Sequence, residues 1–400
     1  MKRHLLRRRA VLAATLLALA APVAAQDRTL SVGKPEDVGM SPGVLEGAVA
    51  LYRESVARGD LVGAVILIAR QGKVVVHEAI GSRNKEANLP MEKNTLFKMA
   101  SNTKPVIATG IGILVDRNQI RYTDLARQYI PSFDNYRSGF IQVRHLLTHT
   151  SGFRIPTLFL APPAGGKVGN LQTEVARFGE VGAVVAPGTS YAYNNPGYNT
   201  LGSLIEIRSG KPLEAFLRDE IYTPLGMVDS YHMETADKLD GKLSRMGAVY
   251  YQRKDGQWVP GWKPGDPPTV PFVRASGGMI STAWDYALFL QMYLNGGVYN
   301  GKRILKEETV KAGIRRQTLD MGVSMAGGAG SDGEQSGYGY GWTVTPEGQY
   351  SHGGSDGTFA WVDPSRELFA MVFTQTPAGP NPIGRFRQLV NLSIETGSRR

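Results

Sequence analysis

Residues 101–115 read Ser-Asn-Thr-Lys-Pro-Val-Ile-Ala-Thr-Gly-Ile-Gly-Ile-Leu-Val, and this stretch decides the fold. From Asn102 onward it is apolar and has a helical pattern. Pro105 is compatible with a helix only in the first turn, where the backbone N–H groups have no intrahelical partners. The sequence therefore predicts a helix that begins at about Ser101. Because Ser101 and Lys104 are three residues apart, they share one face of this helix and the amine can reach the hydroxyl.

A serine at the start of a helix is well placed for nucleophilic chemistry. Its own N–H can point at a developing oxyanion, and the positive end of the helix dipole favours anions there. Lys104 can remove the hydroxyl proton only if burial or a nearby cation lowers its pKa from about 10.4. The tetrad alone is a weak signal, because S-x-x-K arises by chance about once or twice in a chain of this length. An N-capping Ser101 beside a solvated Lys104 is the simpler alternative.

Strand patterns at both ends of the chain flank a helical middle. Residues 61–80 are two β-rich runs broken at Gln71-Gly72-Lys73, which is typical of a hairpin. An amphipathic helix is predicted after Ser41 and Pro42, and a closing helix with Asn381 as its N-cap should end near Gly397. Three more strands are predicted, at 338–344, 357–362 and 368–375.

This order predicts an α+β fold in which both termini complete one sheet and a helical lobe is inserted. The predicted sheet lobe takes in roughly residues 26–100 and 271–400, and the helical lobe roughly residues 101–270.

Two further motifs follow the tetrad in the sequence. Tyr193 and Asn195 form a Y-x-N in a turn-rich loop that leads into a helix. His352-Gly353-Gly354, followed by Ser355, lies between strand signals near the C-terminus. Each motif alone is more often packing or a turn, but the three in this order are specific.

With these motifs the chain resembles the serine β-lactamase and penicillin-binding-protein superfamily, particularly class C β-lactamases and family VIII carboxylesterases. The likeness covers nearly all of the chain after residue 25 and includes residues 35–40, 145–152, 276–278, 281–283 and 360–364. The resemblance implies a β-lactamase/transpeptidase-like fold, with an antiparallel sheet flanked by helices beside the helical lobe. It also implies an active site in the cleft between the lobes.

The same resemblance assigns roles to residues. It implies that Ser101 attacks the carbonyl carbon of the substrate and that Lys104 and Tyr193 share the proton relay. Asn195 would hold the relay and the substrate, and the N–H groups of Ser101 and Ser355 would form the oxyanion hole. No cofactor and no metal is expected.

The third motif departs from the family pattern. Penicillin-recognising members usually carry Lys-Thr-Gly, whereas this chain has His352-Gly353-Gly354. An unperturbed imidazole is mostly neutral at neutral pH, so it does not replace an ammonium that faces a substrate carboxylate. The sequence therefore favours small uncharged esters or amides. The alternatives are a β-lactamase or D-Ala-D-Ala carboxypeptidase, and a cell-wall or β-lactam sensor without turnover.

The first 25 residues have the pattern of a signal peptide. A basic start, an apolar stretch too short to span a bilayer and the small residues Val23-Ala24-Ala25 predict cleavage before Gln26. Arg8-Arg9 leaves open the twin-arginine or the general secretory route. We therefore expect a periplasmic or secreted protein with no stable membrane anchor after cleavage. The segment also holds five of the basic residues, so the formal charge falls from +10 to +5 without it.

Several other function classes find little support. The remaining chain has no basic, aromatic-interleaved run that predicts nucleic-acid binding, and the absence of cysteine excludes Cys catalysis. Gly353 to Gly357 matches G-x-S-x-G, but no histidine follows Ser355 to complete that triad. His145 and His149 are four apart, yet they lack the glutamate of a zinc protease and read as core or capping residues. Oligomeric state is not predicted.

Position alone suggests which segments line the cleft. These are the loops 157–169 and 251–271, with Trp258, Trp262 and Phe272 as apolar walls.

Overall fold

The computed structural model of the protein describes residues 27–155, 160, 169–268, 270–325, 335–377 and 379–397. The predicted signal peptide at 1–25 and most of the loop 157–169 lie outside the described residues. Among the described helices, none is both long enough and apolar enough to span a membrane.

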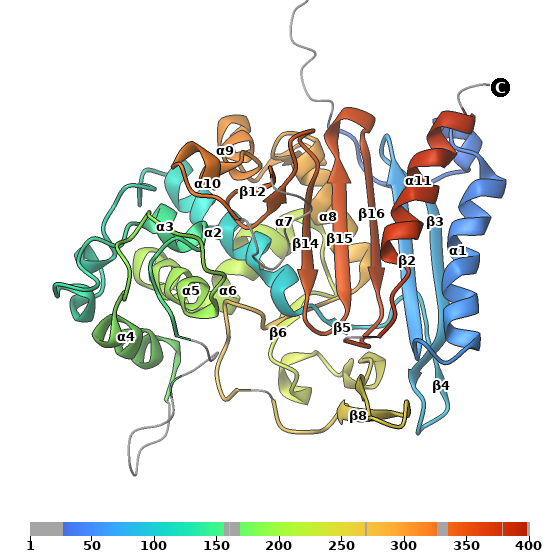
Figure 1. The fold of residues 1–400 in the computed structure, drawn as a ribbon, viewed down its shortest axis with the longest axis horizontal. Helices are drawn as coiled ribbons and strands as arrows, with labels where there is room; N and C mark the ends of the chain where they lie inside the picture. The colour runs from blue at the N-terminus through green and yellow to red at the C-terminus, as the bar shows by residue number, and fades with distance from the viewer. Residues whose placement is uncertain are drawn as a thin grey trace, which may run out of the picture.

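A mixed β-sheet forms the centre of the molecule (Figure 1). Its N-terminal and C-terminal strands meet where β2 pairs with β16, antiparallel, with Val65 opposite Phe373. In spatial order the strands are β1 (Ser31–Val32), β3 (Lys73–Asn84), β2 (Gly63–Arg70), β16 (Leu368–Phe373), β15 (Thr358–Asp363), β14 (Tyr350–Gly354), β13 (Thr343–Val344) and β12 (Gly337–Tyr338), with β4 (Leu89–Pro90) beside β3. The prediction that both termini complete one sheet is confirmed.

One strand pair departs from the antiparallel sheet that the resemblance implied. Among the described strands, β1 runs parallel to β3, with Ser31 opposite Lys73. A parallel neighbour requires a long crossover, and here residues 33–72, with α1 and β2, form that connection.

The predicted hairpin joins β2 to β3. Its two turn residues, Gln71 and Gly72, have φ values of 52° and 78°. Two positive φ angles in a two-residue loop match the twist of the strands it joins.

Helices cover both faces of the sheet, and the side chains of β2 alternate between them. Val65 and Leu67 face the core shared with α2 (Thr103–Asp116) and α8 (Ala283–Leu294). Ile66 and Ile68 face α1 (Pro42–Ala57) and α11 (Ile383–Gly397), which lie together at one side in Figure 1. A strand buried on both faces needs apolar residues at every position, which explains the run Ala64–Ala69.

The start of α11 differs from the prediction. The helix begins at Ile383, so its N-cap position is 382 rather than 381. Instead, the Asn381 Oδ1 accepts a hydrogen bond of 2.7 Å from the Tyr52 hydroxyl of α1. The two helices are therefore joined at this point by a side-chain contact.

The remaining described helices and strands lie outside the central sheet. The further helices are α3 (Val143–Leu147), α4 (Leu171–Val181), α5 (Asn195–Ser209), α6 (Leu213–Leu217), α7 (Thr223–Leu225), α9 (Glu307–Gly313) and α10 (Gln317–Asp320). Small sheets are formed by β5 (Phe97–Lys98), β9 (Met279–Ser281) and β6 (Tyr231–His232), by β7 (Val249–Gln252) and β8 (Trp258–Trp262), and by β10 (Val298–Tyr299) and β11 (Lys302–Arg303).

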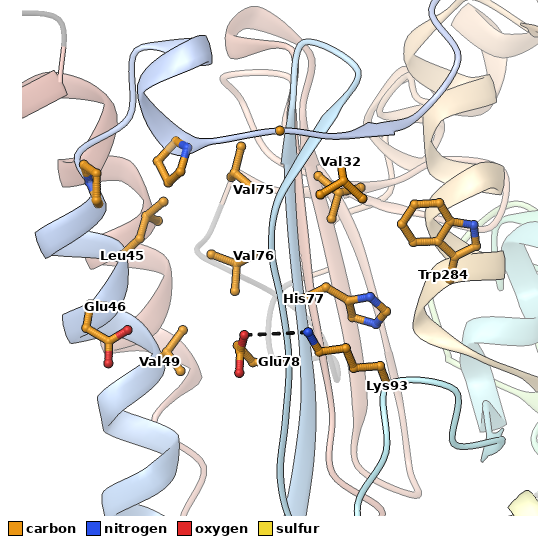
Figure 2. Close-up of a pocket in the computed structure, with 14 residues that line it drawn as sticks. Val32, Leu45, Glu46, Val49, Val75, Val76, His77, Glu78, Lys93 and Trp284 are labelled. Atoms are coloured by element: carbon orange, nitrogen blue, oxygen red, sulfur yellow. Dashed lines mark ion pairs between the residues drawn. The ribbon is translucent and has the colours of Figure 1, made fainter.

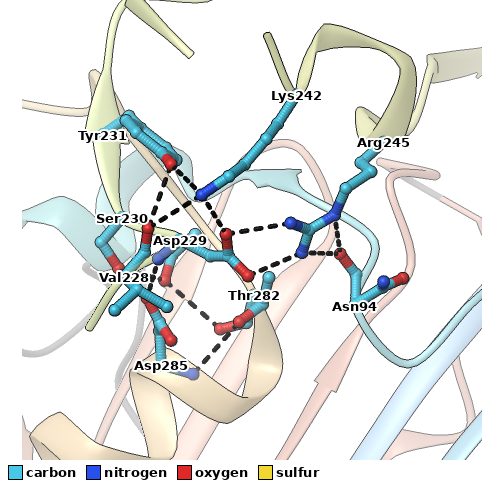
Figure 3. Close-up of polar contacts among 10 residues, drawn as sticks. Asn94, Val228, Asp229, Ser230, Tyr231, Lys242, Arg245, Thr282 and Asp285 are labelled. Carbon is cyan, nitrogen blue, oxygen red and sulfur yellow. Dashed lines mark hydrogen bonds and ion pairs between the residues drawn. The ribbon is translucent and has the colours of Figure 1, made fainter. Parts of the chain in front are cut away.

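A polar cluster fixes the start of α8 (Figure 3). The Thr282 Oγ1 accepts the N–H of Asp285 at 3.1 Å, which caps the helix. The Asp285 carboxylate in turn accepts the N–H of Asp229 at 2.7 Å, and Asp229 pairs with Lys242 and Arg245. Burial raises the pKa of Asp285 to about 6. The cluster therefore joins α8 to the loop before β6.

Substitution of Phe386 tests how α1 and α11 pack on the sheet. Its ring lies 5.4 Å from that of Tyr52 and 5.7 Å from that of Trp361, so it connects α1, α11 and β15. We expect Phe386→Ala to lower the free energy of unfolding by about 3–5 kcal/mol in urea titrations, because a large buried side chain leaves a cavity. The exposed Gln388→Ala on the same helix should change it by less than about 0.5 kcal/mol. Equal effects of the two variants would contradict this role.

Candidate active site

Ser101 sits in a strained turn at the start of α2. A 3₁₀ turn over Ala100–Asn102 precedes the helix, whose first residue is Thr103. Ala100 has a φ of 45°, a conformation that costs a residue with a Cβ on the order of 1–3 kcal/mol. The first bonded amide of the turn is that of Asn102, which donates to the Met99 carbonyl at 3.1 Å. The Ser101 N–H comes one residue earlier in the chain and is not used in the hydrogen bonds of the turn.

The sheet holds this turn in place. The Asn102 side chain donates to the Thr358 hydroxyl at 2.9 Å, and that hydroxyl donates to the Met99 carbonyl, also at 2.9 Å. On the neighbouring strand, a Cβ on Gly354 would lie 2.4 Å from the Met99 oxygen. The close approach of strand and turn therefore requires glycine at position 354, and it brings Ser101 beside the end of β14.

Lys104 is fully buried, and its amine is surrounded by oxygen atoms. The Nζ lies 2.9 Å from the Ser101 Oγ, 2.9 Å from the Asn195 Oδ1 and 2.8 Å from the Ser276 carbonyl. The amide oxygen and the carbonyl can only accept, so each takes one hydrogen of the amine. In a neutral amine the third position holds the lone pair, and this position faces the Ser101 hydroxyl.

The surroundings of Lys104 favour the neutral amine. Burial lowers the pKa of Lys104 well below its usual value, and the nearby positive charge of Arg274 lowers it further. The Arg274 guanidinium donates to the Gly277 carbonyl at 2.6 Å, and the Arg274 carbonyl accepts the Gly278 N–H at 2.9 Å. Arg274 thus braces the turn that presents the Ser276 carbonyl to Lys104. Sequence reasoning missed this residue, because a single arginine before S-G-G forms no pattern of its own.

Tyr193 completes the group around the serine. Its hydroxyl is hydrogen-bonded to Ser101, and its ring centroid lies 4.7 Å from the Lys104 Nζ. Burial raises the pKa of the Tyr193 phenol above its usual range, an effect that the bond to Ser101 partly opposes. The pair is therefore held as amine and phenol.

His352 presents no charge to the cleft. Burial, followed by the proximity of Lys104, lowers its pKa to about 3. The Nδ1 lies 2.7 Å from the Gly353 carbonyl and must donate to it. The Nε2 therefore accepts from the Tyr338 hydroxyl at 2.9 Å. Both ring nitrogens are used within the protein, and the imidazole is neutral.

The predicted site residues meet at one cavity of about 330 Å³. Lys104 and Asn195 lie directly behind Ser101, as their hydrogen bonds show. The cavity is lined by Ser101, Tyr193, Tyr338, Thr343, Ser351, His352, Gly353, Gly354, Ser355 and Phe359. The structure thus brings together all eight residues that the sequence singled out, and it adds Tyr338 and Phe359 from the sheet side.

The aromatic residues suggested as cleft walls lie elsewhere. The Trp258 indole donates to the Gly59 carbonyl at 2.8 Å and packs in a small separate core. The Trp262 ring lies under the Lys98 amine, 4.5 Å from it, and Phe272 belongs to the main core. The described lining of the cavity includes none of the three.

A second and larger cavity, of about 530 Å³, holds different chemistry (Figure 2). It lies between α1, β3 and the start of α8, where His77 stacks on Trp284 and Lys93 pairs with Glu78 at 3.9 Å. Its described lining contains no hydroxyl nucleophile. Within the described residues, no three His, Asp or Glu side chains gather to hold a metal ion.

The chain is similar in sequence to known enzymes. Esterase EstB of Burkholderia gladioli is 26% identical over 360 residues, covering 82% of this chain and 89% of the esterase. N-acetylmuramyl-L-alanine amidase of Bacillus subtilis (strain 168) is 24% identical over 349 residues, covering 80% of this chain and 78% of the amidase.

The fold is also that of solved structures. The octameric penicillin-binding protein homologue from Pyrococcus abyssi matches with a TM-score of 0.71 at 27% identity, covering 90% of this chain and 78% of that chain. A family model described as Beta-lactamase matches residues 48–391, which contain every residue of the candidate site. The chain therefore belongs to the Beta-lactamase family, whose members include serine hydrolases such as esterases.

Proposed function

We propose that this protein hydrolyses small uncharged esters or amides through an acyl-enzyme on Ser101. The observation that carries the proposal is the buried Lys104 amine, whose two acceptor partners leave its lone pair facing the Ser101 hydroxyl. The similarity to an esterase and to an amidase supports the ester and amide classes.

In the first half of the reaction the serine is acylated. The Ser101 Oγ attacks the carbonyl carbon while its proton passes to Lys104. The carbonyl oxygen becomes an oxyanion, which the N–H groups of Ser101 and Ser355 stabilise at the cleft. When the tetrahedral intermediate collapses, the bond to the leaving alcohol or amine breaks. The leaving group takes a proton from the Tyr193 hydroxyl, which Lys104 reprotonates.

In the second half a water molecule releases the acid. Water attacks the acyl carbon and gives its proton to the same relay, again through an oxyanion between the two amides. Collapse breaks the bond to Oγ, and Ser101 recovers its proton. The relay ends in its starting state, so one ester and one water yield one acid and one alcohol.

The third motif supports a preference for uncharged substrates. The neutral His352 has both ring nitrogens bonded within the protein, so it offers no cation to a substrate carboxylate. β-Lactams and D-Ala-D-Ala peptides carry such a carboxylate. They are therefore the weaker candidates.

We further propose that the protein acts outside the cytoplasm. The pattern of residues 1–25 supports export, and the absence of cysteine means that folding there needs no disulfide. N-terminal sequencing of the protein recovered from its host tests this proposal, since a mature chain that begins at Gln26 supports cleavage. A chain that retains Met1 contradicts it.

The first functional test compares two serines of the same cleft. We expect Ser101→Ala to lower kcat/KM for a short-chain p-nitrophenyl ester by about 10³-fold or more, because the nucleophile is lost. Ser355→Ala keeps its backbone N–H and should retain most of the activity. A chromogenic cephalosporin, which carries a carboxylate, should be turned over much more slowly by the wild type. Full activity of Ser101→Ala, or loss confined to Ser355→Ala, would overturn the assignment.

The pH profile tests the role of Arg274. Lys104 must be neutral to act, so activity falls as the pH drops through its pKa. Arg274→Gln removes a nearby positive charge, which makes protonation of Lys104 easier and raises its pKa. We expect the acid limb of the kcat/KM profile to move to higher pH by about one unit. Arg274→Lys should keep the limb close to that of the wild type.

Arg245→Gln is the matched control, since this arginine pairs with Asp229 and is absent from the charges that act on Lys104. An acid limb that stays in place in Arg274→Gln, or moves equally in Arg245→Gln, would show that Arg274 does not set the pKa of the base.

A further inference from the structure

His149 lies directly behind Tyr193, outside the three motifs of the site. It follows α3, has a φ of 58° and is fully buried. Its ring lies 4.2 Å from the Tyr193 ring, centroid to centroid, with the planes tilted by 37°. The imidazole thus supports one face of the Tyr193 ring, whose hydroxyl is hydrogen-bonded to Ser101.

The same histidine also holds the backbone on both sides of Tyr193. The Ala192 N–H donates to the His149 carbonyl at 2.9 Å. The Asn194 N–H donates to the His149 Nδ1 at 3.1 Å. His149 is therefore hydrogen-bonded to the residue before Tyr193 and to the residue after it. Its ring packs against the Tyr193 side chain. Few degrees of freedom remain for Tyr193.

These contacts require a neutral imidazole in one tautomer. A backbone N–H can only donate, so Nδ1 is unprotonated and the proton sits on Nε2. The titratable groups that face the ring are Lys104, His352, Tyr191, Tyr193, Tyr198 and Tyr338. Burial holds the pKa of His149 well below its usual value.

His149 buries an unsatisfied polar atom, which an apolar residue at this position would avoid. Its Nε2 is buried and has no hydrogen-bond partner in the described structure. A phenylalanine would fill the same space among the tyrosines without an unsatisfied polar atom. What phenylalanine lacks is the acceptor for the Asn194 N–H. The position therefore uses histidine for its Nδ1 and for its ring together.

We propose that His149 is the positioning residue of Tyr193, fixing the phenol at hydrogen-bonding distance from Ser101. The proposal rests on the proposed function, in which Tyr193 delivers the proton to the leaving group. His149 touches neither the substrate nor the reacting atoms, so its whole effect passes through Tyr193.

Two substitutions separate the acceptor from the ring. His149→Phe keeps an aromatic ring against Tyr193 but leaves the Asn194 N–H without its acceptor. His149→Asn places an amide oxygen close to the position of Nδ1, and asparagine tolerates positive φ. We expect His149→Phe to lower kcat by roughly 10- to 100-fold with KM within about twofold. His149→Asn restores the acceptor but not the ring, so its kcat should lie between that of His149→Phe and that of the wild type.

The leaving group supplies a readout that packing alone would not move. A p-nitrophenolate leaves without protonation, whereas an alkoxide needs the proton that Tyr193 delivers. The loss in His149→Phe should therefore be larger for a short-chain alkyl ester than for the p-nitrophenyl ester of the same acid. Thermal melting of each variant shows whether the fold is retained. Equal losses on both esters, or losses that simply follow the melting temperature, would overturn the proposal.

A double-mutant cycle closes the test. If His149 acts only through Tyr193, then adding His149→Phe to Tyr193→Phe should cause no further loss on the alkyl ester. Additive losses would show that His149 acts elsewhere, while the proposed function stands. If Tyr193→Phe alone keeps full activity on the alkyl ester, the proton relay itself is wrong, and this outcome is distinct from the failure of the positioning role.

Discussion

The rest of the site depends on the complete removal of one amine from water. Lys104 projects from the first turn of α2 into the protein, and the surrounding oxygens fix the direction of each of its bonds. Burying a charged ammonium is expensive, so the group gives up its proton instead. The neutral form is the one that can take a proton from Ser101. The burial that makes the lysine costly to the fold is therefore also what suits it to act as the base that we propose.

Several residues near the Lys104 amine also destabilise the fold. Ala100 adopts a conformation that suits glycine better, and His149 leaves a ring nitrogen unsatisfied. Arg274 is a cation placed near another potential cation. In a protein selected for stability alone each of these would be replaced, and their clustering at one cleft is typical of a functional site. The sheet compensates for them, since β2 and β16 bury almost every side chain that they carry.

Local signals in the sequence predicted much of this structure, and contacts between distant segments account for the rest. The turn at Gln71-Gly72 was predictable because positive φ angles favour particular residues such as glycine. Pro105 was a second local signal, because proline is tolerated only in the first turn of a helix. Arg274 and His149 were not predicted as parts of the site, because their roles depend on partners far along the chain. The prediction that Trp258 lines the cleft was wrong for the same reason. A position in a loop predicted to line the cleft does not determine which face of a hairpin packs inward.

The lock between the nucleophile turn and the sheet has a consequence for the timing of activity. Asn102 and its partner Thr358 are separated by 256 positions in the chain. A nascent chain still being made on the ribosome lacks β14 and β15 until its last sections emerge, so nothing holds the strained turn around Ser101. Contacts of such long range also form late and slowly during folding. Incomplete or truncated chains therefore lack an ordered turn around Ser101, and the activity that we propose would arise only once the two ends of the sheet have joined.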